Sequence, residues 1–176
     1  MIHKALLLVF ISASQWERSW SCTNIIVSSA ASTEGGVLIG DNDDTAKRFG
    51  AVTHFAAAIW PEGSTRSIYD FETSVYKGEI PQPPKTLNVM GGSNELGVVI
   101  AESTCGGISE LQADNENKIL DYGSLITTTL QRATSARDAI SIIVNLTDTY
   151  GYTSTLEAFR YSFVLLLLFL LIVILI

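Results

Sequence analysis

Two apolar segments near the ends of this chain confine any folded domain to the residues between them. Residues 5–13 form a short apolar run behind a lysine. The run is too short to cross a bilayer core of roughly 30 Å and has the layout of a cleaved secretory signal. Residues 163–176 are all apolar, again fewer than the roughly 20 residues of a usual membrane span. The sequence therefore predicts a signal peptide at 1–21, one domain at 22–155 and an apolar tail at 161–176.

The predicted cleavage site would give the mature chain an unusual first residue. Ser19 and Ser21 are small residues at the two positions that a signal peptidase reads, so cleavage after Ser21 leaves Cys22 as the N-terminus. A thiol and a free α-amine on one residue make a nucleophile and its base. The plain alternative is an ordinary cysteine that follows a signal peptide. Acylation of Cys22 as in a lipoprotein is disfavoured, because such signals prefer an aliphatic residue where Ser19 stands.

Composition excludes several classes of function. The formal net charge of −7 and a pI near 4.7 argue against nucleic acid as a partner. Cys22 and Cys105 are the only cysteines, too few for a disulfide framework. His3 and His54 are isolated in the sequence, so we expect neither a structural metal site nor a cofactor.

The body of the chain is patterned as strands followed by helices. Thr23–Val27 and 37–40 are strand-like runs whose glycine-ended connection suits a hairpin. Helical spacing of apolar residues begins after Asp121 and again after Ser135. Strands first and helices second predict an α+β fold with helices covering a sheet. The second helix should bury a face that consists of Ala136, Ala139, Ile140, Ile143 and Val144.

Three polar stretches are candidates for function. Asp41-Asn42-Asp43-Asp44 follows a strand and is either a turn or the wall of an active site; it lacks the glycine and distal glutamate of an EF-hand loop. Asn94 lies in a glycine-rich loop and offers an amide donor of the kind that an oxyanion hole uses. Asn145-Leu146-Thr147 is an N-glycosylation sequon for a chain made in a eukaryotic secretory pathway.

The apolar tail is predicted as a C-terminal helix with three open interpretations. These interpretations are a short membrane anchor, a lipid-anchor signal with small residues at Thr153-Ser154-Thr155, and a tail that is not native to the fold.

Several motifs, taken in order, resemble one enzyme family. They are Cys22-Thr23, Gly40-Asp41-Asn42-Asp43-Asp44, Gly92-Ser93-Asn94-Glu95-Leu96-Gly97-Val98, Asp121-Tyr122-Gly123-Ser124-Leu125, Leu130-Gln131-Arg132-Ala133, Ala136-Arg137-Asp138-Ala139-Ile140 and Tyr150-Gly151-Tyr152. Over roughly residues 22–154 the chain resembles the N-terminal portion of the cysteine-type dipeptidases of the Ntn-hydrolases, the group of dipeptidase A and the secernins.

The resemblance implies a fold and a set of site residues. The fold would be a partial αββα sandwich, in which antiparallel sheets lie between helices. Cys22 would be the nucleophile with its α-amine as the base, Asp44 would lie close to that amine, and Asn94 would be the oxyanion-hole residue. Asp41 is a departure, because many relatives carry a basic residue there.

The resulting expectation is a cysteine-type dipeptidase that acts on small peptides and needs no cofactor. The alternatives are an amidase acting on a non-peptide amide, and a truncated, inactive homologue attached to a membrane. The leader implies the secretory pathway, with a secreted, lysosome- or vacuole-like or membrane-anchored final location.

Overall fold

Antiparallel pairing of short strands builds most of this structure, because turns interrupt the apolar runs every few residues. The computed structural model describes residues 22–43, 50–106, 118–154, 156–157, 159–163 and 166–168. The predicted signal peptide, Asp44 and the last eight residues of the tail lie outside these ranges.

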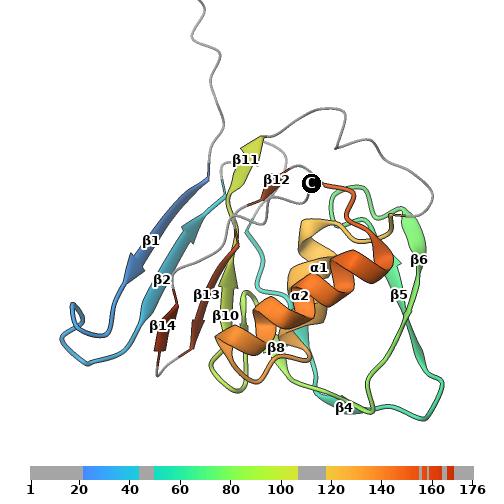
Figure 1. The fold of residues 1–176 in the computed structure, drawn as a ribbon, viewed down its shortest axis with the longest axis horizontal. Helices are drawn as coiled ribbons and strands as arrows, with labels where there is room; N and C mark the ends of the chain where they lie inside the picture. Colours follow the sequence, from blue (N-terminus) through green and yellow to red (C-terminus); the bar gives the residue numbers. More distant parts are fainter. Residues whose placement is uncertain are drawn as a thin grey trace, which may run out of the picture.

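A six-stranded sheet is the centre of the fold, with strand order β14-β13-β10-β9-β8-β3 (Figure 1). Its strands are β3 (His54–Phe55), β8 (Val89–Met90), β9 (Ser93–Asn94), β10 (Val99–Ala101), β13 (Arg160–Phe163) and β14 (Leu166–Leu168). Strand β10 pairs antiparallel with β9 and with β13.

Four two-stranded ribbons surround this sheet. They are β1 (Thr23–Val27) with β2 (Leu38–Asn42), β4 (Ala58–Ile59) with β7 (Lys85–Thr86), β5 (Thr65–Tyr69) with β6 (Tyr76–Pro81), and β11 (Thr104–Gly106) with β12 (Leu156–Glu157). The first ribbon confirms the predicted hairpin. Asp41 and Asn42 belong to strand β2, so the interpretation of these two residues as a turn was wrong.

Two helices cover one face of the central sheet, as Figure 1 shows. They are α1 (Tyr122–Leu130) and α2 (Ala136–Tyr150). Each helix has a side-chain N-cap, because the side chain of Asp121 accepts from Ser124 N–H and that of Ser135 accepts from Asp138 N–H.

The buried face of α2 differs from the prediction at its C-terminal half. Ala139 and Ile143 are buried as expected, but Val144 is 38% exposed and Leu146 is 4% exposed. A helix turns about 100° per residue. Leu146 therefore lies about 40° from the centre of the Ala139–Ile143 face, whereas Val144 lies about 120° away.

The core lies between the helices and the sheet. Its fully buried side chains include Ile68 and Ile80 from the β5–β6 ribbon, Leu125 from α1 and Ile143 from α2. The structure is thus a mixed α/β arrangement in which two helices pack on antiparallel sheets. The four-layer αββα sandwich stays a prediction.

The predicted C-terminal apolar helix was wrong for the part of the tail that the structure describes. Arg160–Phe163 and Leu166–Leu168 are strands, and Tyr161 is 4% exposed within the core. Periodicity cannot separate a short apolar run in a buried strand from one in a helix, and here the edge of β10 supplied a pairing partner. Among the described residues, no helix has the length and apolar character to span a membrane.

Asp121 connects the start of α1 to the β5–β6 ribbon. Its carboxylate accepts from the backbone N–H and hydroxyl of Ser124, at 2.9 and 3.0 Å, and from the N–H of Phe71 at 3.0 Å. Gly123 completes this junction, because a Cβ there would overlap the Phe71 ring.

We predict that Asp121→Ala lowers the free energy of unfolding by about 2–3 kcal/mol, because it leaves buried donors without an acceptor. Ser135→Ala removes one capping bond and should cost about 1 kcal/mol. Urea unfolding of both variants checks this order, and equal losses would contradict it.

Candidate active site

The register of the first hairpin gathers polar side chains around Cys22. Thr23 pairs with Asn42 and Asn24 with Asp41, so continuing the ladder by one step places Cys22 opposite Asp43. Side chains alternate between the two faces of a strand. Cys22, Asn24, Asp41 and Asp43 therefore lie on the same face of the hairpin.

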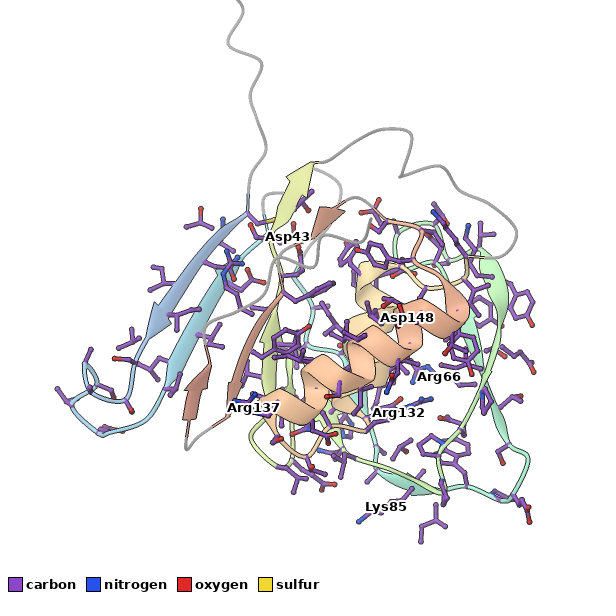
Figure 2. The ribbon with its side chains drawn as sticks, in the orientation of Figure 1. Asp43, Arg66, Lys85, Arg132, Arg137 and Asp148 are labelled. Carbon is purple, nitrogen blue, oxygen red and sulfur yellow. The ribbon has the colours of Figure 1, made fainter. Side chains whose placement is uncertain are left out.

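The thiol of Cys22 is close to a carboxylate. Cys22 is half-buried, forms no disulfide with a described residue, and its Sγ donates to Oδ1 of Asp43 over 3.7 Å. Figure 2 shows Asp43 at the end of β2, where the hairpin approaches β11. A neighbouring carboxylate accepts a hydrogen bond from a thiol but repels a thiolate, so ionisation of the Cys22 thiol is favoured only by a positive charge nearby.

The segment after β10 fixes the hairpin in place. Asn24 Nδ2 donates to the carbonyl of Glu102 over 2.8 Å, and Ser103 Oγ donates to the carbonyl of Cys22 over 3.5 Å. The Oδ1 atom of Asn24 is buried and has no hydrogen-bond partner among the described residues. An unpaired acceptor at this point suits a ligand that donates N–H groups.

Two further charges complete the surroundings. Desolvation and the negative charge of Asp43 raise the pKa of Asp41, while Arg160 and the Asn24 amide act in the opposite direction. Arg160 reaches this region because it is in register with Ala101 on β10. Asp43 thus contacts Cys22, and the charges of Asp43 and Arg160 both act on Asp41.

The structure places Asn94 away from this group. Ser103 follows the C-terminal end of β10, whereas Asn94 lies in β9, which pairs with β10 at its N-terminal end. Asn94 is 7% exposed. Cys22 and Asn94 are thus at opposite ends of β10.

All hydrogen-bonding groups of the Asn94 side chain are in use. Nδ2 donates to the carbonyls of Leu130 and Ala133 over 2.9 and 2.8 Å, at the C-terminal end of α1. Oδ1 accepts from the N–H groups of Leu96 and Val98 over 3.1 and 3.0 Å. Two of these bonds pair carbonyls at and just after the end of α1, and the other two pair backbone N–H groups of the turn into β10. They favour a structural role, and the oxyanion role of Asn94 stays a prediction without support from this geometry.

The remaining candidates divide between those a sequence pattern could find and those it could not. Asn24 and Asp43 follow from strand alternation once Cys22 and the hairpin are recognised. Ser103 and Arg160 come from a distant strand pair and have no local signal. Asp44 lies outside the described residues. Within the described ranges, no group of three or more His, Cys, Asp or Glu side chains is arranged to hold a metal ion.

Comparison with known families identifies one that matches most of the chain. Residues 21–163 match the sequence profile of Peptidase family C69. The match begins one residue before Cys22 and extends through β13. The chain therefore belongs to peptidase family C69, a dipeptidase A-like family of cysteine dipeptidases. No curated protein matches the chain.

We predict that Asn94→Ala lowers the free energy of unfolding by about 3 kcal/mol or more, because it orphans two buried carbonyls and two N–H groups. Ser93→Ala, which removes one exposed bond to the Met90 carbonyl, is the matched control and should cost well under half as much. Urea unfolding measures both. A stable Asn94→Ala variant that loses only activity would support the oxyanion role instead.

We also predict that Asp41→Asn increases stability at neutral pH. Because the pKa of Asp41 is raised in the folded state, ionising it costs stability as pH rises from 3.8 through the raised value. Asparagine removes that cost, so the gain should be present at about pH 7 and absent at about pH 3. Glu34→Gln, an exposed charge change in the same hairpin, is the control. A less stable Asp41→Asn protein at pH 7 would contradict the prediction.

Proposed function

We propose that this member of peptidase family C69 is a cysteine-type dipeptidase whose nucleophile is the Cys22 thiol, exposed as an N-terminal residue by cleavage after Ser21. The observation that carries the proposal is the position of Cys22 at the start of the family match, on a hairpin face shared with Asn24, Asp41 and Asp43. The leader at 1–21 supports entry into the secretory pathway.

The surroundings of Cys22 favour transfer of its proton to an amine. A free α-amine on Cys22 would lie within the same residue as the thiol, with reference pKa values of about 7.7–8.0 and about 8.5. Proton transfer gives an ammonium and a thiolate. The carboxylates of Asp41 and Asp43 stabilise the ammonium, and the charge of Arg160 offsets their repulsion of the thiolate.

The reaction then proceeds by covalent catalysis. The thiolate Sγ forms a bond to the amide carbonyl carbon, the C–N bond breaks, and the α-ammonium returns its proton to the leaving amine. Water hydrolyses the resulting thioester, which releases the carboxylic acid and restores the thiol. Asn24 Oδ1 and the two carboxylates are acceptors, so they suit the protonated amino terminus of a short peptide.

The decisive variant is Cys22→Ala. We expect it to reduce hydrolysis of a panel of dipeptides by at least about a thousandfold, because Cys22 supplies the thiolate of the proposed reaction. Cys105→Ala changes the other cysteine of the chain and should retain activity. Turnover by a purified Cys22→Ala protein would contradict the proposal.

Cleavage of the predicted signal peptide is tested with the same protein preparations. N-terminal sequencing of the secreted protein should begin at Cys22, and Ser21→Phe should block that cleavage and abolish activity. Two alternatives have distinct outcomes: hydrolysis of non-peptide amides without dipeptides indicates an amidase, and correctly processed protein without any turnover indicates an inactive homologue.

A further inference from the structure

Two arginines lie next to each other at the end of α1, far from Cys22. Arg66 on β5 donates from Nη1 to Oε1 of Gln131, and its guanidinium lies 5.6 Å from the centroid of the Phe55 ring. Arg132 donates from Nη2 to the carbonyl of Pro81 over 2.9 Å. Figure 2 shows both arginines between the helices and the β5–β6 ribbon, away from Asp43.

The charges of this pair are not compensated within the described part of the chain. No described carboxylate forms an ion pair with Arg66 or Arg132, and each Nε atom is buried without an acceptor. Burial lowers the pKa of both side chains, and the positive charge of Arg132 lowers that of Arg66 further. Arginine nevertheless stays protonated. Both arginines are half-buried with a buried Nε, and cations withdrawn from water in this way normally have an anionic partner.

A cavity lies beside this pair. Its volume is about 580 Å³, within the range of small-ligand pockets. Its polar lining comes from Lys85, Glu95, Gln131, Arg132 and Thr134, and two leucines form an apolar wall. Glu95 is the single acid among the lining residues, and its Oε1 accepts from the N–H of Asn88.

We propose that this cavity binds a small organic oxoanion, a phosphate or carboxylate compound, through Arg132 and Lys85, with Arg66 adding positive charge from behind Gln131. The planar guanidinium has parallel N–H groups that match the oxygens of such anions. The volume exceeds that of a bare phosphate, and the leucines suit an apolar part of the ligand. This site is separate from Cys22 and does not depend on the proposed peptidase reaction.

Thermal unfolding of the full chain tests the site with inorganic phosphate and with acetate as minimal probes, each against sodium chloride at equal ionic strength. A ligand that binds only the folded state raises the unfolding temperature in a saturable way. We expect such a rise, and the probe with the lower midpoint concentration identifies the preferred head group. The absence of a saturable rise with both probes would overturn the proposal.

Single substitutions test whether the probes bind at this cavity. Arg132→Gln and Lys85→Gln should each weaken probe binding by about tenfold or more, the effect of losing one charge-assisted contact. Arg137→Gln makes the same charge change at an exposed position on α2 and should leave binding intact. Equal weakening by all three would show a general charge effect and overturn the site.

Arg66→Gln separates ligand binding from a structural role. Because it removes an uncompensated charge, the variant should unfold at the same or a higher temperature without probe, yet bind phosphate more weakly. A marked loss of stability without probe, together with unchanged probe binding, would assign Arg66 to the fold alone. Lys85 is exposed, so Lys85→Gln keeps the test decisive where an arginine variant fails to fold.

Discussion

The antiparallel pairing of β10 is the constraint on which the other parts of this structure depend. Its three residues, Val99–Ala101, pair with β9 on one side and β13 on the other, and Ile100 and Ala101 are buried. The two residues that follow it hold the first hairpin through Asn24 and the Cys22 carbonyl. A short central strand thus connects the core, the hairpin of the candidate site and the segment that carries Arg160.

The residues at the two ends of β10 have different roles. At its N-terminal end, Asn94 closes the turn into β10 and caps the carbonyls of α1, so a single buried amide connects sheet and helix. At its C-terminal end, Ser103 holds the Cys22 carbonyl, Cys22 contacts Asp43, and the charge of Arg160 acts on Asp41. The chemistry we propose is therefore kept apart from the hydrogen bonds that stabilise the fold.

Residue patterns in short stretches of the sequence predicted the elements that depend on interactions between neighbouring residues. Strand β1, the hairpin and the starts of both helices follow from strand patterning, turn residues and helical spacing, and the structure confirms them. The role of Asn94 could not be read in the same way, because an amide in a glycine-rich loop looks identical whether its partner is a substrate or a helix end. Arg160 beside Asp41 and Arg66 beside Arg132 depend on contacts between distant segments, for which a single sequence has no signal.

The burial of Tyr161 limits where the chain can be shortened without opening the sheet and the core. β13 covers the backbone groups along one side of β10, and Tyr161 fills the core beneath α2. A protein shortened at Thr155 would present an open row of N–H and C=O groups beside an apolar hollow. Such an edge pairs readily with strands of other molecules. By covering this edge of β10, the first residues of the apolar tail protect the domain against self-association through strand pairing.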